Sequence, residues 1–260
     1  MGSLKRVAVL CGFTLLFAAT AQAEDWQVAK DEDGIKVSLS EVAGSKYKAY
    51  RGVTVIKAPL AKVQALQEDV VGACAWIHEC KSQQLVDKNG DEAWTYTQFK
   101  APFPVTDRDS YIHVTTTKAA DGTVTRKLEG VPTYKPEAKG YVRVAQVDGF
   151  WKLVPKGDNQ TEVTYQVHTE PGGSVPSWLA NKFVVDAPFN TLKALKEHAE
   201  KEVQLIRCLR PLVERLANPH GPERSKPTYG FYRGGTDAEV ECCFHQRPRR
   251  AGSRAIRLRA

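Results

Sequence analysis

Short turn motifs punctuate the middle of the chain and restrict the folds that it can adopt. Lys88-Asn89-Gly90-Asp91, Ala120-Asp121-Gly122 and Lys156-Gly157-Asp158-Asn159 each separate two stretches rich in β-branched and aromatic residues. A parallel strand pair needs a crossover of a dozen or more residues, for which these turns leave no room. The sequence therefore predicts an antiparallel sheet joined by hairpins. The expected strands are residues 35–42, 47–56, 83–87, 93–99, 110–117, 123–128, 141–147, 150–154 and 161–169.

Two other stretches have helical periodicity. Pro59 suits a first helical turn, and the apolar residues after it predict a helix over residues 59–71. A longer apolar stripe predicts a second helix over residues 176–204. Pro188 lies inside this stripe and has no backbone N–H donor, so we expect a kink or a break there. The order of elements predicts an α+β fold in which a curved sheet wraps around the C-terminal helix and encloses a hydrophobic cavity.

The first 23 residues have the pattern of a secretory signal peptide. Lys5 and Arg6 precede an apolar run over residues 7–17, and the small-residue sequence Ala21-Gln22-Ala23 follows. The run is shorter than the roughly 20 residues that span a bilayer. We therefore expect cleavage near Ala23 and a periplasmic or secreted protein.

The last 56 residues differ in charge from the rest. Residues 205–260 hold 12 Lys and Arg against 5 Asp and Glu, so they account for the whole net charge of +7. The sequence predicts one nearly neutral domain over residues 24–204, which gives no reason to expect a nucleic-acid partner. The tail lacks a sustained apolar period and is predicted to be disordered. Its abrupt change in composition also fits translation in an altered reading frame.

Two cysteines, Cys74 and Cys80, lie in the predicted domain. In an oxidising compartment they are close enough in sequence to close a small disulfide loop. Two free buried thiols are the alternative, because cysteine is often buried. Neither pattern has the spacing of a metal site, so no metal and no cofactor are expected.

Three sequence stretches resemble the START family of lipid-transfer domains. They are Tyr50-Arg51-Gly52, then Pro102-Phe103-Pro104-Val105-Thr106-Asp107-Arg108-Asp109, then the stretch from Glu170-Pro171-Gly172-Gly173 to residue 181. They occur in the family's order, and the resemblance covers residues 26–201. It implies a helix-grip fold that holds one phospholipid or similar hydrophobic ligand. It also implies lipid transfer, transient membrane contact and a monomeric protein without enzymatic activity.

Arg108 is the polar residue that the motif places most sharply. On a strand it shares a face with Ser110 and Ile112, whereas Asp107 and Asp109 take the other, outer face. Arg108 should therefore point inward, and its donor fork suits a phosphate. In phosphatidylcholine-binding members of the family the arginine of this motif meets the lipid phosphate, which implies the same contact here.

An internal ion pair is the alternative for Arg108, with Glu92 and Glu129 as candidate partners. Aromatic side chains complete the set of candidate ligand-binding residues, although no position of an ammonium-binding aromatic cage can be matched. They are Trp94, Tyr96, Trp151, Tyr165, Trp178 and Phe183.

No residue pattern predicts catalysis. Gly172-Gly173-Ser174 lacks the next glycine of a nucleophile elbow, and the histidines have no ligand spacing. The alternative function is a cyclase-like small-molecule enzyme on the same fold. Arg108 is always charged and is a poor acid or base, so binding is the preferred interpretation.

Overall fold

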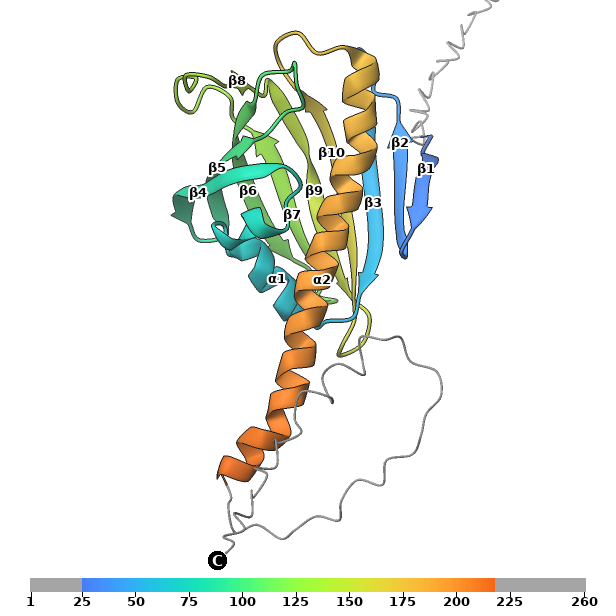
Figure 1. Cartoon of the computed structure of the whole chain (residues 1–260), viewed down its shortest axis with the longest axis vertical. Helices are drawn as coiled ribbons and strands as arrows, with labels where there is room; N and C mark the ends of the chain where they lie inside the picture. The colour runs from blue at the N-terminus through green and yellow to red at the C-terminus, as the bar shows by residue number, and fades with distance from the viewer. Residues whose placement is uncertain (1–24, 218–260) are drawn as a thin grey trace, which may run out of the picture.

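The computed structural model describes residues 25–217, which form a curved sheet, two α-helices and one 3₁₀ helix (Figure 1). The order across the ten-stranded sheet is β1-β2-β3-β10-β9-β7-β6-β5-β4, and β8 pairs with β6. Only the short β6–β8 pairing within this part of the chain is parallel. The predicted antiparallel sheet is confirmed. The elements are β1 (Gln27–Glu32), β2 (Ile35–Ser40), β3 (Ala49–Ile56), α1 (Leu60–Glu68), η1 (Gly72–Ala75), β4 (Cys80–Asn89), β5 (Glu92–Phe99), β6 (Arg108–Lys118), β7 (Val124–Gly130), β8 (Val142–Arg143), β9 (Gln146–Pro155), β10 (Thr161–Glu170) and α2 (Ser177–Ala217).

The edge strand β1 was not predicted. Its residues are mostly exposed, so they lack the apolar alternation that marks a half-buried strand. The turn after it carried a usable signal. Asp33 and Gly34 have positive φ angles of 54° and 71°, and Asp-Gly is a favoured pair for a two-residue hairpin turn.

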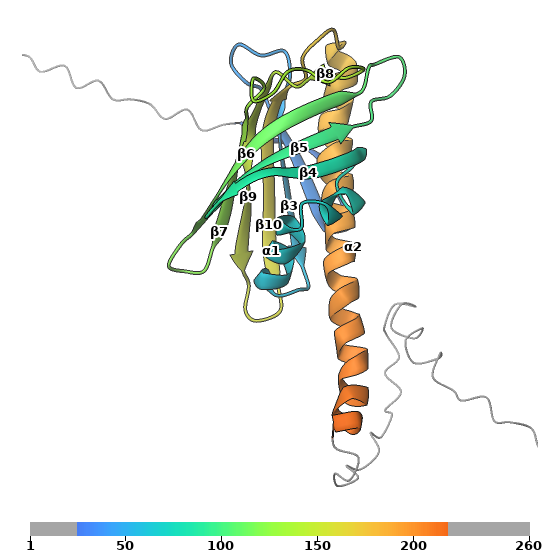
Figure 2. The ribbon, with the colours of Figure 1, turned by 90° about the vertical axis from the view of Figure 1, so that its left-hand side faces the viewer.

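Helix α2 lies across the concave face of the sheet and is continuous (Figures 1 and 2). Of the two outcomes expected at Pro188, a kink or a break, the break does not occur. A proline inside a helix removes one backbone hydrogen bond, but burial of the apolar stripe holds the residues on both sides of it against the sheet. Leu192 and Leu195 on this stripe are fully buried.

The sheet and α2 approach each other closely at Gly52 of β3. A Cβ atom at this position would lie 2.5 Å from Leu192 Cδ1 and 3.6 Å from Pro188 Cβ. The glycine therefore allows Pro188 and Leu192 to pack directly on the strand backbone. This contact explains physically why a glycine stands in the Tyr50-Arg51-Gly52 motif.

Helix α1 is shorter than predicted and ends at Glu68, with Pro59 as its N-cap residue. The chain then turns through η1 into β4. Cys74 and Cys80 form a disulfide across this turn, with their Cα atoms 5.2 Å apart. The sequence left open whether these cysteines are bonded, and the structure shows the bond.

Helix α2 continues past Gln204, where the sequence placed its end, to Ala217. Beyond Gln204 the sequence has leucines spaced by three and four residues, which is a helical pattern. This pattern accounts for the longer helix. The predicted signal peptide and residues 218–260 of the tail lie outside the described residues. Cleavage, disorder and an altered reading frame therefore stay predictions. Among the described residues, no helix is both long and apolar enough to cross a bilayer.

Candidate ligand-binding site

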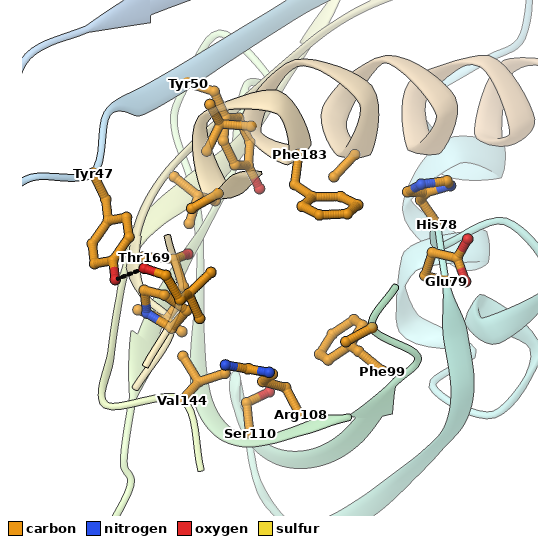
Figure 3. A pocket seen from close by; sticks show the side chains of 18 of the residues that line it. Tyr47, Tyr50, His78, Glu79, Phe99, Arg108, Ser110, Val144, Thr169 and Phe183 are labelled. Atoms are coloured by element: carbon orange, nitrogen blue, oxygen red, sulfur yellow. Dashed lines mark hydrogen bonds between the residues drawn. The ribbon is translucent and has the colours of Figure 1, made fainter. Parts of the chain in front are cut away.

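A cavity of about 300 Å³ lies between the concave face of the sheet and the first turns of α2 (Figure 3). Its walls are mainly apolar. The sheet contributes Ile112, Leu128 and Val147, and α2 contributes Phe183 and Val184. The volume lies at the lower end of the range for small-molecule sites. The predicted internal hydrophobic cavity is present.

Arg108, the first residue of β6, points into this cavity (Figure 3). Its Nη1 donates a hydrogen bond to the carbonyl oxygen of Thr106, and its Nη2 donates to the carbonyl oxygen of Gly172 at 3.4 Å. Burial lowers the pKa of Arg108 from its ordinary value, yet a guanidinium remains charged in proteins. The predicted inward orientation is confirmed.

No carboxylate forms an ion pair with Arg108 in residues 25–217. The two candidate partners are engaged elsewhere: Glu92 lies 3.5 Å from His113 Nε2, and Glu129 lies 3.1 Å from Lys127 Nζ. Both lie on strands that present them away from the cavity. The positive charge of Arg108 is therefore available to a ligand.

Asp107 immediately precedes β6, and its side chain forms its hydrogen bonds outside the cavity. Its carboxylate accepts hydrogen bonds from Lys81 Nζ at 2.7 Å and from the backbone N–H of Ala101 at 2.9 Å. The hydrogen bond from Lys81 is the main reason why the pKa of Asp107 lies below its ordinary value. The outward position predicted for Asp107 is confirmed.

The prediction that Asp109 lies on the outer surface is wrong, because this residue is completely buried. Its carboxylate accepts hydrogen bonds from Arg143 Nε at 2.8 Å and Nη2 at 3.0 Å, and from the Tyr96 hydroxyl at 3.0 Å. Arg143 also donates to the carbonyl oxygens of Pro132 and Lys135, in the connection between β7 and β8. This connection covers the outer face of β6, which strand alternation alone did not reveal.

Two of the predicted aromatic residues, Tyr165 and Phe183, line the cavity. A third, Trp151, does not line it but contacts Tyr165. Trp151 is buried and stacks on Tyr165 with ring centroids 3.7 Å apart. Tyr50, which was not predicted, meets Tyr165 edge to face at 5.3 Å and also lines the cavity. Burial raises the pKa of both tyrosines, so both stay protonated.

Trp94, Tyr96 and Trp178 do not line the cavity. Alternate residues of β5 take opposite faces, and Phe99 is on the cavity side, so Trp94 and Tyr96 are on the outer side. There Trp94 stacks on His113 at 4.4 Å. Trp178, at the beginning of α2, is 72% exposed. A contact between these three side chains and a ligand inside the cavity is not supported by their positions.

Comparison with known proteins agrees with this geometry. The family model described as START domain matches residues 14–204, which is well over half of the chain. The chain belongs to the START domain family. Membership implies that the cavity binds a lipid or another hydrophobic ligand.

Three proteins similar to this START domain illustrate its relationships. An uncharacterized protein of Pseudomonas aeruginosa is 61% identical over 201 residues, which cover 77% of this chain and 100% of the relative. The phosphatidylcholine transfer protein of Mus musculus is 29% identical over 181 residues, covering 65% of this chain and 81% of that protein. The crystal structure of a STAR-related lipid transfer protein from Xanthomonas axonopodis has a TM-score of 0.64 and 42% identity. It covers 67% of this chain and 98% of that structure.

Several cavity residues of this START domain were missed from the sequence. Tyr47 lines the cavity and donates from its hydroxyl to the carbonyl oxygen of Val175 at 3.3 Å. Ser110 lines it too, and its place on the Arg108 face was the available signal. His78 and Glu79 reach the cavity from the disulfide loop, which no local pattern indicated. No group of three or more acidic, histidine or cysteine side chains in the described part of the chain is placed to hold a metal.

Proposed function

We propose that this START domain holds one phospholipid in its cavity, with the acyl chains against the apolar walls and the phosphate at Arg108. The observation that carries the proposal is a guanidinium that points into a mainly apolar cavity and has no carboxylate partner among residues 25–217. A charge in such a place needs an anionic partner, and a phosphate fits the planar donor fork. Similarity to the phosphatidylcholine transfer protein supports a phospholipid as the ligand class.

We propose further that the protein transfers its lipid during transient contact with a membrane. Phe103, in the connection between β5 and β6, is 97% exposed, and Trp178 at the beginning of α2 is 72% exposed. Both segments also supply cavity-lining residues, namely Pro102 and Leu179. Exposed aromatic residues favour the interface between a bilayer and water. Their position fits the end of the molecule through which a lipid enters.

A role in binding, without catalysis, is the third part of the proposal. Arg108 stays charged, and burial keeps the hydroxyls of Tyr50 and Tyr165 protonated. His78 is one residue that a cyclase-like enzyme could use as an acid or base, because it lines the cavity, with its Nδ1 3.5 Å from Asn190 Nδ2. We expect His78→Ala to leave lipid retention unchanged. Conversion of a bound lipid by the wild type and not by this variant would favour the enzyme.

Export and a monomeric state complete the proposed function. A disulfide between Cys74 and Cys80 supports an oxidising compartment such as the periplasm, because disulfides rarely persist in the cytosol. Cell fractionation with detection of the mature N-terminus tests export. Light scattering of the purified protein tests the monomeric state.

The binding proposal is tested by native mass spectrometry of protein purified from the periplasm, followed by extraction of the bound species and uptake of fluorescent phospholipids. We expect one phospholipid per chain and, for Arg108→Ala, at least tenfold weaker binding, because a charge-assisted hydrogen bond contributes about 1.5–3 kcal/mol. Arg51→Ala is the matched control, since its guanidinium lies 4.0 Å from the Trp26 ring, outside the cavity. An empty cavity together with no lipid uptake would contradict the proposal.

A further inference from the structure

Ser110 lies two residues after Arg108 on β6 and shares its inward face. Its side chain is 3% exposed, and its hydroxyl oxygen has no hydrogen-bond partner in residues 25–217. Figure 3 shows Ser110 beside the Arg108 side chain at the wall of the cavity. A buried hydroxyl without a partner costs free energy, so a ligand group that accepts its hydrogen bond would be favoured.

In the described part of the chain, the acidic residues next to Arg108 and Ser110 in sequence do not face the cavity, where they could bind a cationic headgroup. Asp107 is held by Lys81 at 2.7 Å and Asp109 by Arg143 at 2.8 Å, both away from the cavity. Glu79 is the one carboxylate among the cavity-lining residues in the described part of the chain, and it belongs to the exposed turn before β4. The polar groups beside Arg108 therefore suit an anion.

The aromatic rings near this end are also poorly placed for a quaternary ammonium group, which binds against ring faces. The Nζ of Lys46 already lies over the Tyr47 ring, 5.2 Å from its centroid, so a second cation would be repelled there. One face of Tyr165 is covered by Trp151 at 3.7 Å. These contacts weaken the attraction that aromatic rings offer to choline.

We propose that Arg108 and Ser110 form a two-point anion site, and that Ser110 determines specificity for a lipid whose phosphate carries no cationic group. The guanidinium binds one or two phosphate oxygens, and the Ser110 hydroxyl donates to another. Phosphatidic acid has the most free phosphate oxygens among simple phospholipids and is the expected best ligand. This inference rests on the proposed function, because it requires a phospholipid in the cavity.

The test compares acyl-labelled fluorescent phosphatidic acid, phosphatidylcholine and diacylglycerol with identical chains, taken up by the full chain from vesicles. We expect the wild type to bind phosphatidic acid at least fivefold more tightly than phosphatidylcholine. Ser110→Ala should weaken phosphatidic acid binding roughly tenfold, the effect of one hydrogen bond to a charged group, and change the other two ligands less than twofold. Ser38→Ala, which removes a hydroxyl of similar burial on β2 outside the cavity, should change nothing.

Each other result overturns the inference in a recognisable way. Equal binding of phosphatidic acid and phosphatidylcholine by the wild type excludes the preference, whatever the variant does. An equal loss of all three ligands in Ser110→Ala means that only packing was disturbed, and no loss means that the hydroxyl is not a contact. Displacement of phosphatidic acid by inorganic phosphate alone would identify a soluble phosphate as the ligand. If no lipid binds even to the wild type, the proposed function itself fails.

Discussion

Three consecutive charged residues at the start of β6 have three different environments. Asp107 meets Lys81 near the surface, Arg108 points into the cavity, and Asp109 is buried with Arg143 on the opposite face. Strand alternation directs the arginine and its acidic neighbours to opposite sides, and the acids form their ion pairs with Lys81 and Arg143 instead. The Asp109–Arg143 pair also joins β8 to β6, whose register places Arg108 beside Val142. It therefore helps to hold the backbone of Arg108, which we propose binds the lipid phosphate.

Asp109→Asn should destabilise the protein by about 3–5 kcal/mol, because it leaves the guanidinium of Arg143 buried without its counter-charge. Urea unfolding measures the change. Asp107→Asn is the matched control two residues away. Its partner Lys81 is partly exposed and its charge is screened by water, so the expected cost is much smaller. Equal effects of the two substitutions would contradict the assignment of Asp109 to a buried pair.

The pH dependence of this pair has a definite sign. Burial is the largest single influence on the pKa of Asp109 and raises it, but the hydrogen bonds from Arg143 and Tyr96 act together with the charge of Arg143 to lower it, and the pKa in the folded state is below the ordinary value. The stabilisation by Asp109 is thus complete above about pH 5 and is lost as pH falls through about 3.9 towards the lower folded value. The stability difference between the wild type and Asp109→Asn should shrink over this interval. A stability difference between the wild type and Asp109→Asn that stays constant down to pH 3 would contradict this pH dependence.

At the scale of elements, the turn between η1 and β4 lines the cavity and is closed by a disulfide bond. The Cys74–Cys80 disulfide closes this turn, and Ile77, His78 and Glu79 within it line the cavity opposite Arg108 (Figure 3). The backbone N–H of His78 also donates to Thr191 Oγ1 of α2 at 3.1 Å. The disulfide therefore restrains a segment that contacts both the cavity and the helix covering it.

Replacement of both cysteines by serine should lower the free energy of unfolding by about 2 kcal/mol, the loop-entropy effect for a ring of this size. It should also speed the release of a bound fluorescent lipid, because the turn gains freedom to move away from α2. Stopped-flow transfer to acceptor vesicles measures the release. Dithiothreitol should have the same effect on the wild type and none on the double variant. If neither the double substitution nor reduction of the wild type speeds lipid release, the turn does not restrain the lipid.

At the scale of the whole molecule, the cavity is enclosed because a curved sheet and one long helix cover each other. The β5–β6 connection and the beginning of α2 lie at one end of the sheet, whereas α1 lies towards the other (Figures 1 and 2). These two segments contain the exposed aromatic residues Phe103 and Trp178. This arrangement predicts which end of the molecule faces the bilayer in the membrane contact that we propose. A lipid leaving along the apolar walls would pass between the β5–β6 connection and α2.

The double substitution Phe103→Ser and Trp178→Ser should reduce vesicle binding and slow lipid transfer at least fivefold, because about 1.5–3 kcal/mol is gained when one large apolar side chain leaves water. Its folding should be unaffected, since both side chains are exposed. Val71→Ser is the matched control, as Val71 is 71% exposed and follows α1. Vesicle co-sedimentation and the transfer rate are the measurements. Equal effects of the control and the double variant would contradict this orientation.

The periodicity of the chain was sufficient to predict much of the fold and part of the site. Turn motifs with Gly and Asn predicted the antiparallel order, and alternation placed Arg108 inward with Ser110 beside it. The same alternation along β5 puts Trp94 and Tyr96 on the face opposite to Phe99, which lines the cavity. These predictions succeed because a side chain's face on a strand depends only on its local position.

Contacts between distant segments decided the rest. Arg143 reaches Asp109 across 34 residues, because the connection after β7 folds over the outer face of β6. Pro188 stays within a helix because Gly52 lets it pack against β3, and the disulfide turn brings His78 to the cavity. The sequence by itself determined which residues share a face. Only the tertiary structure decided what covers each face, because burial and ion pairing depend on segments that meet only after folding.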